Sequence, residues 1–235
     1  MMLVIDCGNT RAKWGLHDGN RFVSVDATPL DAMQRLHDVL DAIDPPTAIA
    51  VSNVANATAR MHIERAIARF NVVPRWIAST QAACGVRNLY EDPARLGTDR
   101  WAAMIGAWHR HRGSSVIVNC GTATTIDRLN DTGEFIGGII IPSIGLMKKA
   151  LSENTAKLPL ADGRWVENPR TTRDAIETGC VEATVGAIER ARARAGAMAR
   201  FFLTGGASDL IAASLIQPVE RVEHLTLEGL LRLGQ

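Results

Sequence analysis

The fold of this chain is decided by a stretch that occurs twice: LVIDCGNT at residues 3–10 and VIVNCGTATT at residues 116–125. Each copy is an apolar, β-branched run followed by an acid or amide, a Cys-Gly pair and hydroxyl residues. β-Branched residues favour strands, and a glycine after a strand lets the backbone turn sharply. A second strand-like run, a turn and a third strand-like run follow each copy, so both copies predict the same β-rich start.

The repeat divides the chain into two related halves. Asp6 and the matching Asn119 are 113 residues apart in a chain of 235 residues, close to half its length. We therefore predict an α/β protein with an N-terminal domain over residues 1–113 and a C-terminal domain over residues 114–235.

Helices are expected between and after the strand-like runs. Apolar residues at helical spacing predict helices over residues 31–43, 58–70 and 172–195. Within the last of these, Gly179 and Gly186 are expected to interrupt the helix.

Charge and hydropathy exclude several classes of protein. Lys and Arg number 26 and Asp and Glu number 25, which leaves a net charge of +1. Such a chain has no overall field to attract nucleic acid or an anionic membrane. No apolar run approaches the roughly 18 residues of a membrane-spanning helix, and the N-terminus does not have the pattern of a signal peptide. We expect a cytoplasmic protein with no nucleic-acid or membrane partner.

The two Cys-Gly turns are candidates for phosphate binding. Successive N–H groups in a glycine turn, with hydroxyl side chains beside them, suit phosphate oxygens. Asp6, at a strand end, is suited to hold Mg²⁺ through water, and Lys13 to neutralise phosphate charge. A third candidate is LTGGAS at residues 203–208, where paired glycines allow a purine or ribose to approach the backbone. Structural turns without a ligand, and an exposed lysine on an edge strand, are the alternatives.

The segment LGTDRW at residues 96–101 introduces a helix with a buried face. Thr98 is suited to be its N-cap, and Asp99 in the first turn is favoured by the helix dipole. Arg100 is a cation where the dipole is unfavourable, which invites an anionic ligand. Asp99 and Arg100 could therefore act as a base and an anion clamp.

In this order, these motifs, with Gly137 and Gly138 ahead of Pro142, resemble the type III pantothenate kinases over nearly the whole chain. The resemblance implies two duplicated ribonuclease-H-like domains of the actin, acetate-kinase and sugar-kinase type around a nucleotide cleft. It also implies ATP-dependent phosphorylation of pantothenate to 4′-phosphopantothenate, the first step of coenzyme A biosynthesis.

The resemblance implies particular site residues. Asp99 would be the general base, and Asp6 would bind Mg²⁺ through water. The residues implied to bind ATP are Asp6, Cys7, Gly8, Asn9, Thr10, Arg11, Ala12, Lys13 and Thr122. Those implied to bind pantothenate are Tyr90, Gly97, Thr98, Asp99, Arg100 and Thr172.

The resemblance further implies a homodimer and a monovalent cation, K⁺ or NH₄⁺. Here the chain departs from the family pattern, because Asn119 stands where the family has an aspartate that helps to bind this cation. Asn119 keeps an oxygen ligand but loses one negative charge. Ser143, after Pro142, also replaces a commoner glycine.

Two other functions fit the same sequence. One is an ATP-binding accessory regulator of gene expression that lacks kinase activity. The other is a related small-molecule kinase with a different acceptor.

Overall fold

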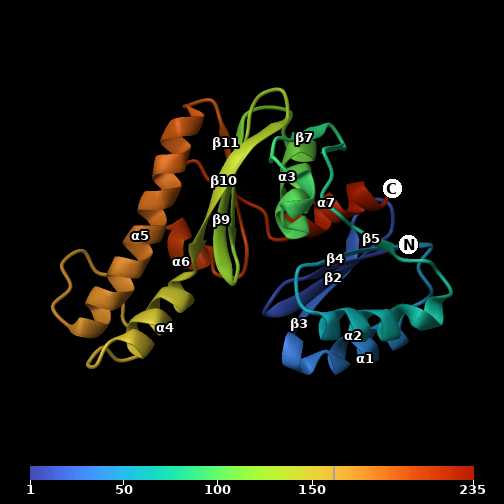
Figure 1. Ribbon diagram of the computed structural model, residues 1–235, viewed down its shortest axis with the longest axis horizontal. Coiled ribbons are helices and arrows are strands. Elements are labelled where there is room, and N and C mark those ends of the chain that lie inside the picture. Colours follow the sequence, from blue (N-terminus) through green and yellow to red (C-terminus); the bar gives the residue numbers. More distant parts are fainter. Residues whose placement is uncertain (161) are drawn as a thin grey trace. The chain divides into compact units, whose positions relative to one another are not determined.

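The computed structural model describes residues 1–160 and 162–235, which form two compact α/β units (Figure 1). The first unit comprises Met1–Arg112, Gly133–Phe135 and His224–Gln235, and the second comprises Gly113–Thr132 and Ile136–Glu223. The α/β class is therefore confirmed. These two units are not separated by a single boundary after residue 113. The later segments Gly133–Phe135 and His224–Gln235 also pack with the first unit.

The first unit is built on a five-stranded sheet with the order β3-β2-β1-β4-β5. Strands β1, β2 and β3 form an antiparallel meander, while β4 pairs parallel to β1 and β5 parallel to β4. The strands are β1 (Met2–Cys7), β2 (Arg11–His17), β3 (Phe22–Pro29), β4 (Ala48–Asn53) and β5 (Arg75–Trp76).

Helices cover this sheet on both faces. Helices α1 (Gln34–Asp41) and α2 (Ala57–Ile67) lie on one face (Figure 1), and α3 (Thr98–Arg110) and α7 (Leu225–Gly234) pack on the other. Short 3₁₀ turns stand at Leu30–Ala32, Ala68–Phe70 and Pro93–Arg95. The helices predicted over residues 31–43 and 58–70 are thus each part 3₁₀ and part α-helix.

The alternation of side chains along β1 decides which residues reach the site. Leu3, Ile5 and Cys7 are buried in the core beneath α1 and α2. Successive side chains of a strand point to opposite faces, so Val4 and Asp6 point to the face that α3 and α7 cover. The same alternation in β4 places Ser52 on that face.

A small hairpin completes the first unit. Strands β6 (Ala82–Ala83) and β7 (Val86–Asn88) pair through a turn in which Cys84 and Gly85 have positive φ angles. Strand β7 then runs parallel to Glu134 and Phe135, the first residues of β10 (Glu134–Pro142).

The second unit repeats the strand order of the first. Its sheet runs β12-β11-β8-β9-β10, with β8 and β9 antiparallel and β11 parallel to β8. This order corresponds strand by strand to β5-β4-β1-β2-β3, so the predicted duplication is confirmed. The further strands are β8 (Ser115–Cys120), β9 (Ala123–Leu129), β11 (Arg200–Thr204) and β12 (Glu220–Arg221).

The helices found among the described residues of the second unit are α4 (Ile144–Asn154), α5 (Thr172–Ala195) and α6 (Ser208–Ala212). The predicted interruption of α5 is wrong, because the helix continues through Gly179 and Gly186. A glycine inside a helix costs only about 1 kcal/mol. Burial of one face of α5 against β8 and β9, through residues such as Ile176 and Ile188, outweighs that cost.

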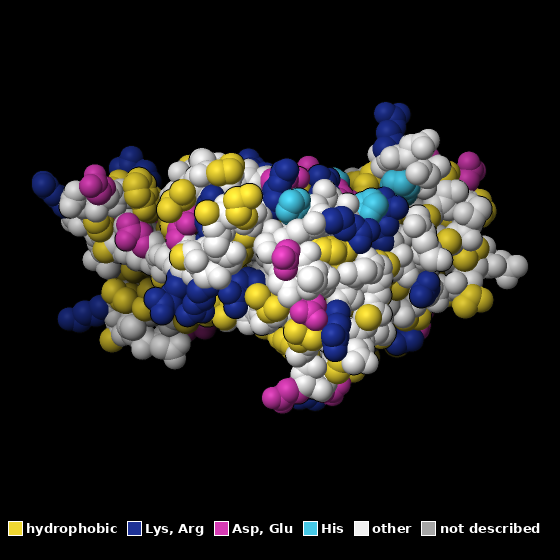
Figure 2. All heavy atoms as spheres, turned by 90° about the horizontal axis from the view of Figure 1, so that it is seen from above, with side chains coloured by type: hydrophobic (Ala, Val, Ile, Leu, Met, Phe, Trp, Pro, Cys, Tyr) yellow, Lys and Arg dark blue, Asp and Glu magenta, His cyan; other side chains and the backbone are white. Residues whose placement is uncertain are grey.

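The surface carries charges of both signs. Acidic and basic side chains both occur across the face shown in Figure 2, in keeping with the net charge of +1. Among the residues that the structure describes, no helix is both long and apolar enough to cross a membrane.

Helices α3 and α7 approach each other through glycines. A Cβ added at Gly229 would lie 1.8 Å from the carbonyl oxygen of Ala102, and one at Gly106 would lie 2.4 Å from that of Leu225. Both are backbone atoms, which cannot move aside as the end of a flexible side chain can. The spacing of the two helices therefore depends on the absence of these side chains.

We expect Gly229→Ala to lower the free energy of unfolding by about 3 kcal/mol, because a methyl group would force the two helices apart. The matched control is Gly186→Ala in α5, where an added Cβ meets no described atom within 4 Å. It should raise stability by about 0.5–1 kcal/mol. Urea unfolding measures both values, and equal effects of the two variants would contradict this packing.

Candidate active site

Asp6 is the central polar group of the first unit. Its residue is half-buried, and its Oδ1 atom is buried without a hydrogen-bond partner among the described residues. Burial, followed by the nearby Asp99 carboxylate, raises the pKa of Asp6 to about 7. A hydrogen bond from Ser52 and the charge of Lys13 act in the opposite direction and lower this pKa. A carboxyl group whose pKa is raised by burial and by a second carboxylate nearby is a candidate functional group.

The first Cys-Gly turn joins β1 to β2. Asp6 and Cys7 end β1, while Gly8, Asn9 and Thr10 form the turn, and Arg11, Ala12 and Lys13 begin β2. The Gly8 N–H donates to the Arg11 carbonyl at 3.0 Å. The β1–β2 register places Lys13 opposite Asp6. The side chains of Cys7 and Ala12 are buried in the core, so only their backbone can meet a ligand.

The second Cys-Gly turn joins β8 to β9 and is closed in the same way. The Gly121 N–H donates to the Ala123 carbonyl at 3.1 Å, and Thr122 is exposed in the turn. The predicted glycine pair at residues 203–208 packs directly on it, since Ala207 N–H donates to the Cys120 carbonyl at 3.1 Å. A Cβ at Gly205 would lie 2.5 Å from that carbonyl oxygen. These two features are therefore one local structure of the second unit.

The first turn of α3 carries Thr98 and Asp99. The prediction that Thr98 is the N-cap is wrong, because the N-cap is Gly97 and Thr98 is the first helical residue. The Thr98 hydroxyl instead lies 2.8 Å from the Ser52 Oγ. Asp99 Oδ1 accepts the backbone N–H of Arg100 at 2.8 Å. A Cβ at Gly97 would lie 2.6 Å from that oxygen, so glycine makes room for the Asp99 carboxylate.

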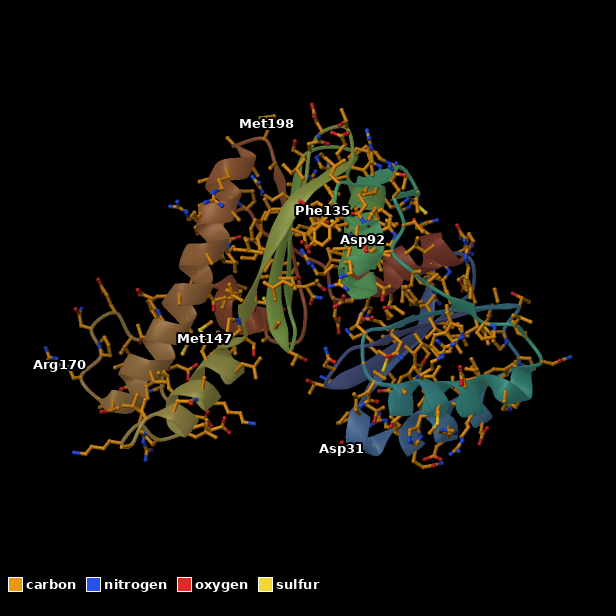
Figure 3. The ribbon with its side chains drawn as sticks, viewed as in Figure 1. Asp31, Asp92, Phe135, Met147, Arg170 and Met198 are labelled. Carbon is orange, nitrogen blue, oxygen red and sulfur yellow. The ribbon has the colours of Figure 1, made fainter. Side chains whose placement is uncertain are left out.

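Arg100 is held among aromatic rings. It is 5% exposed, and its Nη1 donates to the Tyr90 hydroxyl at 3.0 Å. The guanidinium also lies 5.7 Å from the centre of the Phe135 ring, which Figure 3 shows at the start of β10. Asn88 braces the Tyr90 segment, since its Oδ1 accepts the Tyr90 N–H at 3.1 Å and its Nδ2 donates to the Pro93 carbonyl at 3.2 Å.

Thr172 lies elsewhere, as the exposed first residue of α5 in the second unit. The N-cap before it is Thr171, whose hydroxyl accepts the Asp174 N–H at 3.1 Å. The structure thus gathers Asp6, Lys13 and Asp99 into one charged cluster of the first unit. Thr122 and Thr172 belong to the second unit, and a shared site with that cluster stays a prediction.

Ser52 is the residue that sequence analysis missed. It is fully buried near the end of β4, beside Asp6 in the β1–β4 register, and its Oγ lies 2.8 Å from the Thr98 hydroxyl. Its signal in the sequence is a hydroxyl directly after the apolar run of residues 48–51. This signal is weak by itself, because serine is common at strand ends.

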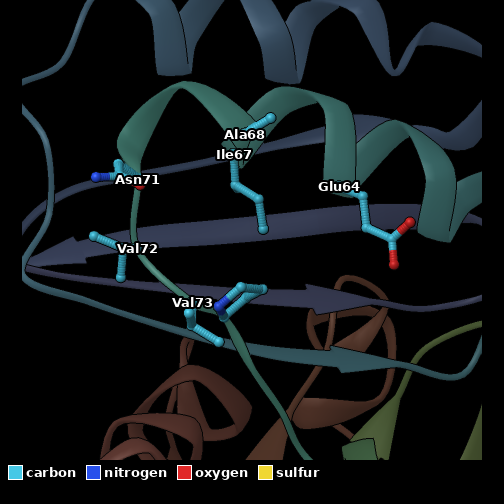
Figure 4. Close-up of a pocket in the computed structure, with 7 residues that line it drawn as sticks. Glu64, Ile67, Ala68, Asn71, Val72 and Val73 are labelled. Carbon is cyan, nitrogen blue, oxygen red and sulfur yellow. The ribbon is translucent and has the colours of Figure 1, made fainter.

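A separate cavity offers little to a charged ligand. It measures about 320 Å³ and lies beside the C-terminal end of α2 (Figure 4). Its lining residues are Glu64, Ile67, Ala68, Asn71, Val72, Val73 and Pro74. Its one carboxylate, Glu64, already accepts from Arg60 at 2.8 Å. The cavity therefore presents a mainly apolar lining.

The duplicated strand order defines the actin and sugar-kinase class of α/β proteins. A solved protein of the Baf family of transcriptional activators from Campylobacter jejuni matches with a TM-score of 0.65 at 21% identity, covering 98% of this chain and 96% of that one. The activator of 2-hydroxyisocaproyl-CoA dehydratase from Clostridium difficile, solved with bound ADPNP, matches with a TM-score of 0.58 at 10% identity, covering 99% and 93%. At these identities the likeness establishes the fold alone.

Sequence similarity is more specific. Residues 2–194 match the type III pantothenate kinase family. The type III pantothenate kinase of Aromatoleum aromaticum is 44% identical, covering 98% of this chain and 96% of the relative. That of Dechloromonas aromatica is 40% identical, covering 100% and 99%. The chain belongs to the type III pantothenate kinase family.

Kinases of this family use ATP with a divalent metal ion. The first unit offers one arrangement of carboxylates that suits such an ion. Among the described residues, no group of three or more His, Cys, Asp or Glu side chains could enclose a metal. Mg²⁺ is commonly held by one or two carboxylates, phosphate oxygens and waters. The unpartnered Oδ1 of Asp6, with Asp99 close by, suits that arrangement.

We expect Asp6→Asn to stabilise the metal-free chain above pH 7. The folded-state pKa of about 7 exceeds the ordinary value of 3.8, so the folded chain holds a proton that the unfolded chain has lost. Below about pH 4 this proton contributes its full stabilisation of the folded chain, and the stabilisation is lost as the pH rises through 7. The variant should gain on the order of 2–4 kcal/mol at pH 8 and little at pH 4.

Urea unfolding in EDTA at both pH values measures this gain. The control, Asp44→Asn at an exposed carboxylate, should show no comparable pH-dependent gain. An Asp6→Asn chain that is no more stable than the wild type at pH 8 would contradict the burial of this charge.

Proposed function

We propose that this chain transfers the γ-phosphoryl group of ATP to the primary hydroxyl of pantothenate and so forms 4′-phosphopantothenate, the first step of coenzyme A biosynthesis. The observation that carries the proposal is the coupling of Asp6 and Asp99 in one partly buried cluster of a type III pantothenate kinase. Phosphoryl transfer needs positioning and neutralising charge more than covalent help from the protein. Both are available in this cluster.

Both Cys-Gly turns contact ATP in this proposal. The residues of the first turn are Asp6 to Lys13, whose backbone N–H groups and Lys13 charge would hold phosphate oxygens. Thr122 would supply the contact from the second turn. Asp6 would hold Mg²⁺ through water, and the ion would neutralise the charge of the transferring phosphate. The closing N–H···O bonds at Gly8 and Gly121 keep each turn in shape.

Asp99 acts as the general base. Its Oδ1 is oriented by the Arg100 N–H at the start of α3, which aims the carboxylate without neutralising it. It accepts the proton of the pantothenate hydroxyl as the oxygen attacks the phosphorus. Tyr90, Gly97, Thr98 and Arg100 form the pantothenate pocket with Asp99, and Thr172 contributes from α5. The buried Arg100 guanidinium suits an anionic group such as the pantothenate carboxylate.

We expect ADP release from the wild-type chain when ATP, Mg²⁺ and pantothenate are all present. A coupled ADP-release assay measures it, with and without K⁺ or NH₄⁺. Release with another alcohol but not with pantothenate would favour a related kinase with a different acceptor. ATP binding without turnover of any acceptor would favour a regulator without kinase activity.

Asp99→Asn should lower kcat by about 10²–10⁴-fold, because the amide keeps the shape but cannot accept the proton. ATP affinity and melting temperature should stay near the wild-type values. Asp131→Asn, at an exposed carboxylate, is the matched control and should leave kcat unchanged. A folded Asp99→Asn chain that retains most of its turnover would exclude this base.

A monovalent cation, K⁺ or NH₄⁺, activates the reaction in this proposal. Asn119 ends β8 at the place that Asp6 occupies in β1, and its amide oxygen is a neutral ligand. Neutral oxygens are suitable ligands for K⁺. Because one negative charge is lost, activation should need more cation than with an aspartate at this position.

The chain forms a homodimer in the cytoplasm in this proposal. Three isoleucines of β10 expose large apolar side chains: Ile136 at 43%, Ile139 at 40% and Ile140 at 61%. Contiguous exposed apolar residues commonly mark a protein interface. They support a second copy of the chain as the partner.

A further inference from the structure

Asn88 ties together both ends of the loop that carries Tyr90. It ends β7, where its backbone N–H donates to the Gln81 carbonyl at 2.8 Å. Its side chain is buried, and the residue is 2% exposed. The Oδ1 atom accepts the Tyr90 N–H at 3.1 Å, and the Nδ2 atom donates to the Pro93 carbonyl at 3.2 Å. An amide offers an acceptor and a donor at once, so one side chain holds both ends of the loop.

The loop held in this way brings Tyr90 to Arg100. Arg100 Nη1 donates to the Tyr90 hydroxyl at 3.0 Å, and the Tyr90 ring packs on the Phe135 ring with centres 5.3 Å apart. A guanidinium has no acceptor atom, so the Tyr90 oxygen must accept in this bond whatever the state of any carboxylate nearby. Among the described residues, no acceptor stands opposite the remaining phenolic proton. That proton is left for a ligand.

We propose that Asn88 is a positioning residue for the acceptor substrate. It holds Tyr90 beside Arg100, where the phenolic proton is donated to an oxygen of pantothenate, a carbonyl or the carboxylate. The inference rests on the proposed function, since Tyr90 and Arg100 line the same pocket. It adds that affinity for the acceptor depends on an amide that is too deeply buried to touch the substrate.

The proposal distinguishes Asn88 from a purely structural amide, which would affect stability alone. Asn88 controls how often the loop over residues 89–93 holds Tyr90 in place. When only a fraction of the molecules can bind, the apparent Kd rises by the inverse of that fraction. A loop that is correctly placed about one tenth of the time binds pantothenate about 10-fold more weakly. Catalysis after binding is unaffected, because Asp99 lies on α3 and not on this loop.

The first test uses Tyr90 as a probe, because it is the only tyrosine in the chain. Tyrosine labelled with ¹³C at Cζ therefore gives one NMR signal, from the carbon that carries the phenolic hydroxyl. Pantothenate should shift this signal in the wild-type chain. Asn88→Ala should change the signal of the free chain and should need about 10-fold more pantothenate for half of the shift.

Steady-state kinetics separate positioning from catalysis. Asn88→Ala should raise the pantothenate KM by about 10-fold and leave kcat and the ATP KM near their wild-type values. Tyr90→Phe should also raise the pantothenate KM, by about 10-fold. The double variant should lose less than the product of the two single losses, because Asn88 acts through Tyr90.

Asn88→Ser is the conservative variant, and it replaces Asn88→Ala in these tests if that chain fails to fold. A serine hydroxyl can accept the N–H two residues on, as the asparagine does, although more weakly. It is too short to reach Pro93 as well. The pantothenate KM should therefore rise by only about 3-fold.

The matched control is Asn130→Ala in the turn between β9 and β10. The Asn130 Oδ1 accepts the Thr132 N–H at 3.1 Å, which is the same contact, with the same spacing, as that between Asn88 and Tyr90. This variant should lower the melting temperature but keep the wild-type pantothenate KM and the wild-type Tyr90 signal.

Three results would overturn the inference alone: wild-type pantothenate affinity in folded Asn88 variants, single losses that multiply in the double variant, or a Tyr90 signal that bound pantothenate does not move. All three leave the proposed function intact if the wild-type chain phosphorylates pantothenate. A wild-type chain that neither binds nor phosphorylates pantothenate would overturn the proposed function and the inference together.

Discussion

The pairing of β1 with β4, which sets Ser52 beside Asp6, is the constraint on which the candidate site of the first unit depends. It joins two parallel strands at the end where an apolar sheet becomes a polar site. A buried carboxylate without such partners would be strongly disfavoured. Ser52 and the charge of Lys13 act against that cost, while the burial of Oδ1 and the nearby Asp99 maintain it. The raised pKa of Asp6 records the balance between these effects.

The two duplicated units carry different polar residues at equivalent strand ends. Both units repeat a central strand, a Cys-Gly turn and a parallel neighbour that carries a hydroxyl residue at or near its end: Ser52 beside Asp6 and Thr204 beside Asn119. Only the first copy keeps the carboxylate. In the second copy the Cys-Gly turn is packed against the Gly205 turn instead. The first unit is thus specialised for charge, and the second has a more neutral strand end.

The C-terminal helix α7 is part of the first unit, which carries the charged cluster. Although α7 follows the second unit in the chain, it packs on β1 and β4 of the first unit and against α3. Glycines at the α3–α7 contact allow the backbones to approach closely. Because α3 begins with Thr98 and Asp99, this packing also helps to place the candidate base. The position of the site therefore depends on residues at the far end of the chain.

The sequence by itself determined the α/β class, the repeated strand–turn–strand pattern, the two Cys-Gly turns and the family, since each follows from a local pattern or from motifs in a fixed order. Tertiary structure alone decided that Gly97 caps α3, that Ser52 lies beside Asp6 and contacts Thr98, that α5 continues through its glycines and that α7 returns to the first unit. These features depend on pairing and packing between segments far apart in the chain. Local propensity cannot encode them, because a hydroxyl or a glycine has the same local preferences whichever neighbour the fold brings to it.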